Sequence, residues 1–117
     1  PQRAVFAGID MRDAFTRLRD KWWARHAEFG SLDLCIGIST GTCLLGNMGS
    51  DKRVEYTSIG TAVNQAFALC REAPRGEIRI GGRTHSDVHE DVQLVPVESA
   101  ASTGQQAHAV VGLKYLY

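Results

Sequence analysis

Residues 46–66, with the sequence GNMGSDKRVEYTSIGTAVNQA, form the stretch that decides the fold of this 117-residue chain. Their order predicts a turn bracketed by glycines, a basic pair, a strand over residues 54–59, a break at Gly60 and a helix that opens on Thr61. A polar junction between a strand and a helix leaves backbone N–H groups without partners and attracts anions. By itself, this local chemistry fits a phosphate site and an ordinary turn with a helix cap equally well.

The composition is that of one small globular domain spanning residues 1–117, with 44% hydrophobic and 22% charged residues. Lys and Arg together number 13, as do Asp and Glu, so no net charge recruits nucleic acid or an anionic membrane. Apolar residues flank Cys35, Cys43 and Cys70, which predicts buried free thiols in a reducing compartment. The sequence has no signal-peptide pattern and no membrane segment, so we expect a soluble, cytoplasmic domain.

The N-terminal quarter of the chain predicts an amphipathic helix over residues 4–28, which ends at Gly30 and Ser31. The apolar residues on its inner face are separated by four, three and four positions: Met11, Phe15, Leu18 and Trp22. Charged residues, among them Asp10, Asp13 and Asp20, occupy the other face and are expected to be solvated.

The rest of the chain alternates between strand and helix patterns. Residues 32–40 and 42–45 predict a hairpin that turns at Thr40 and Gly41. The remaining predicted elements are a helix over 62–73, a short helix capped by Thr84, a polar loop over 98–106, and strands over 77–80, 92–97 and 107–117. This order predicts an α+β fold, with one antiparallel-rich sheet and helices mainly on one face.

Four blocks along the chain resemble the class III adenylate and guanylate cyclase catalytic domain. They are IGISTG at 36–41, GNMGSDKRVEYTSIG at 46–60, VNQA at 63–66, and APRGEIRI at 73–80 followed by Thr84. The resemblance implies a ferredoxin-like cyclase fold, and it covers only the C-terminal part of that domain. The family's N-terminal strand, helix and hairpin, which supply two metal-binding aspartates, have no counterpart in this sequence.

The resemblance also implies an activity. Class III cyclases convert ATP or GTP to the cyclic nucleotide and pyrophosphate, through attack of the ribose 3′-oxygen on the α-phosphorus. They use Mg²⁺ or Mn²⁺, whose family ligands are absent from this chain, so we expect no metal-binding residue in it. Family sites form between two antiparallel subunits, which implies a homodimer, a strand-exchanged dimer or pairing with another cyclase domain.

Individual site residues follow from the same resemblance. Asn64 matches the asparagine that positions the ribose, and the alternative for it is a capping or buried role. Thr61 occupies the position of the base-reading aspartate, and it is also expected to cap the second helix. The position of the family's transition-state arginine falls on Ala68, which carries no charge. Arg71 lies on the same helix face as Asn64 and is a candidate substitute.

Lys52 and Arg53 are further substrate-binding candidates, because they precede the third strand and would approach a triphosphate across a dimer. Solvated turn charges are an equal alternative for both.

These departures leave two main hypotheses. In the first, the chain is a piece of an adenylate cyclase domain and is inactive alone. In the second, it is a degenerate cyclase homology domain that serves regulation or dimerisation. A third, an unrelated ferredoxin-like binding domain, is disfavoured by the ordered blocks. The family's missing first strand is central to its sheet, so we expect an open strand edge that another chain fills, or else low stability.

Overall fold

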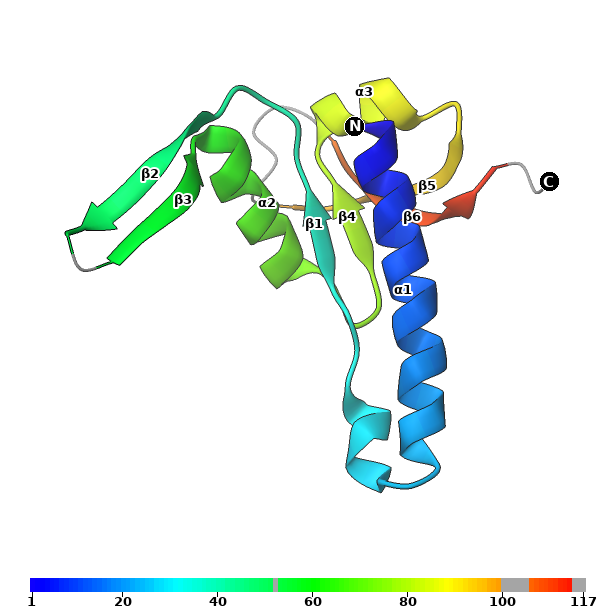
Figure 1. Cartoon of the computed structure of the whole chain (residues 1–117). Helices are drawn as coiled ribbons and strands as arrows, with labels where there is room; N and C mark the ends of the chain where they lie inside the picture. Colours follow the sequence, from blue (N-terminus) through cyan, green and yellow to red (C-terminus); the bar gives the residue numbers. More distant parts are fainter. Residues whose placement is uncertain (52, 100–105, 115–117) are drawn as a thin grey trace.

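The computed structural model describes residues 1–51, 53–99 and 106–114. Helices and strands are interspersed along this part of the chain (Figure 1). They are α1 (Gln2–Trp23), the 3-10 helix η1 (Ala27–Ser31), β1 (Ile36–Ile38), β2 (Leu44–Ser50), β3 (Arg53–Ile59), α2 (Thr61–Glu72), β4 (Ile78–Ile80), α3 (Gly82–Val88), β5 (Val92–Val97) and β6 (Ala107–Leu113). The predicted α+β class is therefore confirmed.

Four strands form the sheet of the main body, in the order β1-β4-β6-β5. Strand β1 runs parallel to β4, whereas the β4–β6 and β5–β6 pairs are antiparallel. Among the described strands only β4 pairs with β1, so β1 forms one edge of this sheet. Strands β2 and β3 form a separate antiparallel ribbon, the β2–β3 arm, which projects away from the body (Figure 1).

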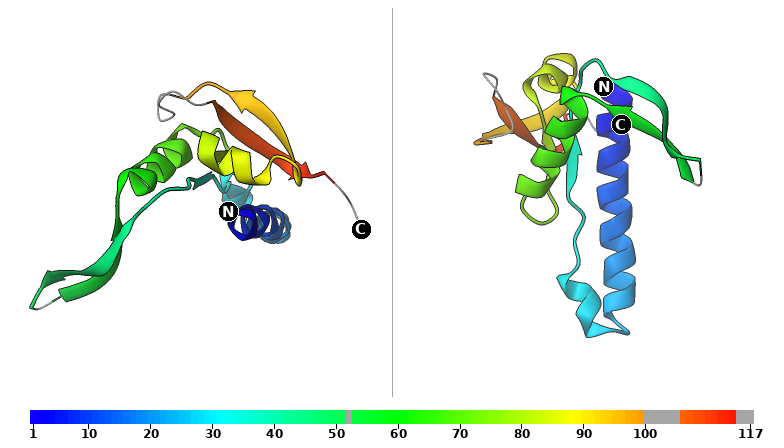
Figure 2. Two further views of the ribbon diagram at one scale, coloured as in Figure 1. Left: turned by 90° about the horizontal axis from the view of Figure 1, so that it is seen from above. Right: turned by 90° about the vertical axis from the view of Figure 1, so that its left-hand side faces the viewer.

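The core lies between the sheet and two helices, α1 and α3. Its buried apolar residues come from both helices and from three strands: Val5, Ile9, Ile78, Ile80, Val88, Val92 and Val110. Figure 2 shows α1 and α3 next to one another on the same side of β5 and β6. Burial of branched apolar side chains such as these supplies most of the stabilisation of a small domain.

Helix α2 packs against the opposite face of β1. A Cβ on Gly8 of α1 would meet the Cδ1 atoms of Ile36 and Ile38, whereas a Cβ on Gly37 would meet the backbone of α2. Because neighbouring residues of a strand point to opposite faces, α1 and α2 cover different sides of β1. The predicted placement of helices mainly on one face thus holds for α1 and α3, with α2 on the other side.

Arg12 of α1 fixes an irregularity in β6. The β5–β6 register shifts between Gln93 and Leu94, which leaves Val111 as an extra residue on β6. The guanidinium of Arg12 donates to the carbonyl oxygens of Val110 at 3.0 Å and of Val111 at 2.9 Å. Two carbonyls at this bulge are thereby satisfied by a charged donor, which ties α1 to β6.

Four predictions of local structure are wrong. Residues 46–50 are part of β2 and not a turn, and β2 pairs with β3 and not with β1. The N-terminal helix ends at Trp23, because the chain folds back into η1 and brings Gly30 against the Trp23 ring. Thr84 lies inside α3, and Gly81 is the residue that precedes this helix.

The three cysteines are free thiols, as predicted, and Cys35 and Cys70 are partly buried. Cys43 is exposed, so its predicted burial is wrong, because it lies in the segment that leads out to the β2–β3 arm. Across the described residues, no helix is both long and apolar enough to cross a membrane.

Candidate functional site

Gly60 makes the sharp junction between β3 and α2. Its backbone has φ 157° and ψ 170°, a conformation that only glycine adopts readily. A Cβ at this position would also lie 3.0 Å from the carbonyl oxygen of Thr42. The carbonyl of Gly60 accepts the first helical hydrogen bond, from the backbone N–H of Asn64 at 3.2 Å. This break places the N-terminus of α2 directly at the base of the β2–β3 arm (Figure 1).

The predicted capping role of Thr61 is wrong. Gly60 is the residue that precedes α2, and no side chain caps this helix. Thr61 is instead the first helical residue, and its side chain is exposed. Among the described residues, the N–H groups of the first turn of α2 therefore have no side-chain acceptor, and a helix N-terminus in this state favours an anion.

Three of the predicted substrate-binding residues share one face of α2. Thr61, Asn64 and Arg71 are exposed, and their spacing of three and seven residues places them on one stripe of a helix. Ala68, which is half-buried, falls on the same stripe between Asn64 and Arg71. The structure thus brings these positions together on a face that points away from the sheet.

The opposite face of α2 is held in place by the body. Leu69 is fully buried, and a Cβ on Gly37 would lie 2.2 Å from the Ala66 carbonyl oxygen and 2.6 Å from the Cys70 nitrogen. At Gln65, the side-chain oxygen Oε1 accepts a hydrogen bond from the Ser39 hydroxyl. The first two turns of α2, which carry Thr61 and Asn64, are therefore fixed against the end of β1.

A second contact links the segment after β1 to α3. The hydroxyls of Thr40 and Thr84 lie 2.8 Å apart, and Thr84 is completely buried. The backbone N–H of Gly81 donates to the Ile38 carbonyl at 3.1 Å. These supporting residues were not identified from the sequence, where Thr84 matched a helix cap. The only available signal was the match of Thr84 to the fourth motif block.

Of the other two predicted substrate-binding residues, the structure describes the position of Arg53 only, and its backbone is not near α2 within this chain. Arg53 begins β3 at the far end of the arm, six positions before Ile59. At about 3.3 Å per strand residue, this is roughly 20 Å from the junction at Gly60. Lys52 lies outside the described residues.

The described residues do not fit a divalent cation. No cluster of three or more His, Cys, Asp or Glu side chains with metal-binding geometry occurs among them. Asp10, Asp13 and Asp20 are exposed on α1, where Asp13 lies 3.8 Å from Arg12 and Asp20 lies 3.6 Å from Arg19. We therefore assign no chemical step of this chain to a metal ion.

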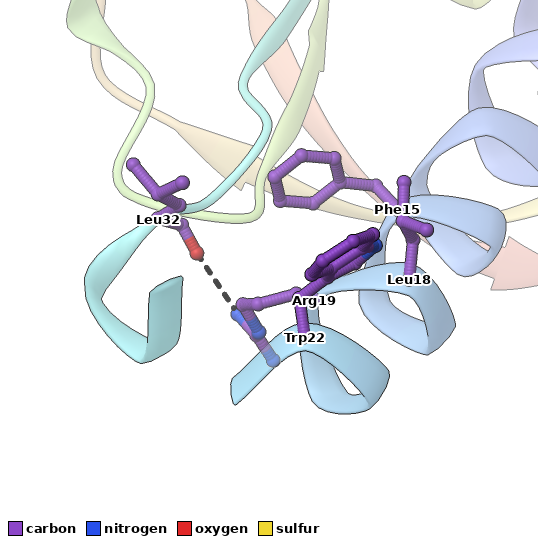
Figure 3. A pocket seen from close by; sticks show the side chains of 5 residues that line it. All are labelled: Phe15, Leu18, Arg19, Trp22 and Leu32. Atoms are coloured by element: carbon purple, nitrogen blue, oxygen red, sulfur yellow. Dashed lines mark hydrogen bonds between the residues drawn. The ribbon is translucent and has the colours of Figure 1, made fainter. Parts of the chain in front are cut away.

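An apolar pocket of about 290 Å³ lies at the other end of the body (Figure 3). It is lined by Phe15, Leu18, Arg19, Trp22 and Leu32. Arg19 donates to the Leu32 carbonyl at 3.3 Å and forms an ion pair with Asp33 at 3.4 Å. The carboxylate of Asp33 therefore neutralises the charged side chain among the residues that line this pocket. An apolar wall of this kind cannot stabilise a triphosphate, and the pocket is not part of the α2 site.

Comparison with known proteins gives this arrangement a family. The model of the adenylate and guanylate cyclase catalytic domain matches residues 5–112. The chain belongs to this cyclase family. The resemblance inferred from the four sequence blocks is thereby confirmed, and so is the cyclase fold.

Solved cyclase structures are similar over most of the chain. The adenylyl cyclase CyaB from P. aeruginosa is 32% identical with a TM-score of 0.78, over 92% of this chain and 57% of that chain. The guanylyl cyclase Cya2 is 25% identical with a TM-score of 0.73, over 99% of this chain and 60% of that chain. An uncharacterized protein of Mycobacterium tuberculosis is 42% identical over 53 residues, which are 45% of this chain and 10% of that protein. The chain therefore spans less than two thirds of the length of each of these relatives, and about a tenth of the mycobacterial protein.

Proposed function

We propose that this chain is the C-terminal part of an adenylate cyclase domain that converts ATP to cyclic AMP and pyrophosphate when the domain is complete. The observation that carries the proposal is the exposed stripe of α2, where Thr61 and Asn64 follow directly on the glycine junction. ATP is preferred over GTP because the adenylyl cyclase CyaB is the more similar of the two solved relatives, with 32% against 25% identity. Cyclic-nucleotide signalling in the cytoplasm is the corresponding cellular role.

In this proposal, α2 binds and orients the nucleotide. The side-chain amide of Asn64 offers both donors and an acceptor, so it holds the ribose with the 3′-oxygen facing the α-phosphorus. The Thr61 hydroxyl donates to or accepts from the edge of the base. The reaction forms a bond from the 3′-oxygen to the α-phosphorus, and the 3′-hydroxyl gives up its proton to water. The bond from the α-phosphorus to the oxygen that bridges it to the β-phosphorus breaks, so pyrophosphate leaves. The described residues offer no cluster for the family's Mg²⁺ or Mn²⁺, so we assign Asn64 and Thr61 the binding and orientation of the nucleotide.

Charge stabilisation is the weak point of the site. The stripe has Ala68 where the family has its transition-state arginine, and an alanine cannot stabilise charge that builds on the α-phosphate. Arg71 lies three residues further on, about 4.5 Å along the helix axis. In our proposal its guanidinium substitutes in part by reaching back toward Asn64.

We also propose that the site is completed by a second protomer, in a homodimer. The α2 stripe is flanked by large apolar side chains that are highly exposed: Leu44 at 72%, Ile59 at 45% and Phe67 at 64%. Leu44 and Ile59 are register partners at the base of the arm, and Phe67 lies on α2 between Asn64 and Arg71. A second copy packed against this surface would bury these residues and supply the other wall of the nucleotide site. In a dimer of this kind, Lys52 or Arg53 of one protomer would approach the phosphates held by the other.

An assay of the complete protein with ATP and Mn²⁺ tests the proposed activity. We expect cyclic AMP from the complete protein, and about 100-fold less from Asn64→Ala, because one preorganised hydrogen-bonding group is typically worth this much. The 117-residue chain alone should produce none. Asp10→Asn is the matched control, since Asp10 is an exposed polar residue on α1, and it should leave the rate unchanged. Full activity of Asn64→Ala would refute the assigned role.

Static light scattering tests the dimer. We expect Phe67→Glu to weaken self-association tenfold or more, because it puts a charge into an apolar interface. Val95→Glu is the control, since Val95 is also about half-exposed, at 49%, but lies on β5 away from α2. A wild-type chain that stays monomeric and stable at all concentrations would contradict the proposal.

The alternative is a cyclase homology domain that regulates or dimerises without catalysis, and Ala68 is the observation that favours it. The same two experiments separate the hypotheses. A complete protein that dimerises through Phe67 and makes no cyclic AMP with Mn²⁺ and ATP is a regulatory module.

A further inference from the structure

Three histidines stack on one another beside α3: His85 and His89, which are four positions apart, and His108 from the distant strand β6. The rings of His85 and His108 are 3.9 Å apart between centroids with an interplanar angle of 11°. The rings of His85 and His89 are 5.4 Å apart with an angle of 26°. His85 is thus the central ring, between His108 of β6 and His89 at the end of α3.

The surroundings of the two outer rings, His89 and His108, limit which of their nitrogens can carry a hydrogen. In His89, Nδ1 lies 3.1 Å from the Ser86 carbonyl oxygen and 3.3 Å from the His85 carbonyl oxygen. Both are acceptors, so this nitrogen carries a hydrogen and any further proton must go to Nε2. In His108, Nδ1 is buried and has no hydrogen-bond partner among the described residues. A doubly protonated His108 would therefore bury an N–H group without an acceptor.

Within the described part of the chain, no acidic side chain forms an ion pair with this stack. None of the ion pairs among the described residues joins these histidines to a carboxylate, and Arg83, Asp87 and Glu90 around α3 are all exposed. On the packed strands, β5 has no ionisable residue, and Arg79 of β4 is paired with Glu77 at 2.5 Å. On α1, Arg3 and Asp10 are exposed, and Asp91 accepts a hydrogen bond from Gln2.

These surroundings oppose protonation of the central ring. Burial lowers the pKa of His85 from its ordinary value of 6.5, and the neighbouring His108 and His89 lower it further. The unfolded chain consequently binds more protons than the folded chain as the pH falls below about 6.5, so stability rises with pH in this range. The stabilising contact is fully present above this pH and is lost on acidification.

We propose that the histidine stack is a pH-sensitive latch, which holds α3 against β6 at neutral pH and releases it when the central ring, His85, becomes charged. The released element is also the one that carries Thr84, whose hydroxyl bonds to Thr40 in the segment after β1. The adjacent Ser39 bonds to Gln65 of α2, so the latch is linked by two hydrogen bonds to the helix of the candidate site. The latch depends on the geometry of α3 and β6 and not on the proposed cyclase activity.

Hydrogen–deuterium exchange of the full chain tests the latch without any activity assay. Protection factors, corrected for the intrinsic effect of pH on exchange, are compared at about pH 7.5 and about pH 5.5, on either side of the ordinary histidine pKa. EDTA in both buffers excludes bound metal. We expect amides of α3 and of residues 39–42 to lose roughly tenfold in protection at the lower pH, whereas those of the β2–β3 arm do not change.

Two variants separate the stack from a general effect of acid. His85→Gln should abolish the pH dependence at α3, and His26→Gln, which changes a histidine outside the stack, should retain it. If His85→Gln does not fold, His89→Gln at the exposed end of the stack should reduce the dependence. A wild-type chain whose α3 protection is independent of pH, or a dependence that survives unchanged in His85→Gln and His89→Gln, would overturn the proposal.

Discussion

Gly37→Ala should destabilise the domain by about 3 kcal/mol or more, because α2 can no longer dock on β1. The added Cβ would lie 2.2 Å from the Ala66 carbonyl oxygen and 2.6 Å from the Cys70 nitrogen. Both obstacles are backbone atoms in the middle of a helix, so no side-chain rotation relieves the clash. The whole of α2 must move away, and with it Thr61 and Asn64.

Urea denaturation followed by circular dichroism measures this effect. Gly46→Ala is the matched control, since Gly46 is also in a strand but a Cβ there would meet nothing within 4 Å. We expect the control to unfold at or slightly above the wild-type urea concentration, because alanine restricts the unfolded chain. Equal stability of the two variants would show that α2 does not pack closely on β1.

Ala68→Arg should raise the turnover of the complete protein by roughly 100-fold, if α2 forms the nucleotide site as proposed. The new guanidinium would lie one helical turn after Asn64, on the exposed stripe where charge builds on the α-phosphate. Alanine and arginine both favour helices, so the substitution should leave the stability of α2 almost unchanged.

Steady-state cyclic AMP formation with ATP and Mn²⁺ is the measurement. Ala68→Gln provides the control, because it adds a long polar side chain without the charge and should give little gain. The gain should appear in kcat rather than in KM, since the charge acts mainly in the transition state. A similar gain from both variants would mean that the effect is steric, and no gain from Ala68→Arg would favour the regulatory module.

The fold could be inferred from the sequence because its motif blocks lie in order over most of the chain. The bounds of α2 and β5 and the start of β6 agree with their predictions to within one residue. The face of α2 was also predictable, since it follows from helical spacing alone. In these cases local pattern and tertiary structure agree.

The β2–β3 arm shows where local reasoning fails. The sequence predicts a turn at Gly46 and Gly49, because glycine usually interrupts a strand. In the structure both lie within β2, where Gly46 pairs with Thr57 and Gly49 pairs with Val54 of β3. Gly49 has φ 136°, a backbone conformation that glycine adopts readily, so this glycine is used within the strand. Glycines in a sequence cannot by themselves distinguish a turn from a paired strand, because the hydrogen bonds that decide between them come from the partner strand β3.

Contacts between distant residues were also invisible in the sequence. His85 and His108 are 23 positions apart and stack only because α3 packs on β6. Thr40 and Thr84 meet for the same kind of reason, at the crossing of two segments whose positions are set by the parallel β1–β4 pair. Contacts between side chains of different helices and strands can be predicted only once the order and direction of the strands are known.

The strand order β1-β4-β6-β5 also governs when the domain can fold. Strand β1 cannot pair until residues 78–80 have been made, and β4 cannot complete its pairing until residues 108–110 follow. The arm and the helices form from local contacts, whereas the sheet needs nearly the whole chain. On the ribosome, the part of α1 that packs on β6 therefore stays uncovered until that strand emerges. A chain that stops before β6 lacks Val110 of the core and the strand that joins β4 to β5.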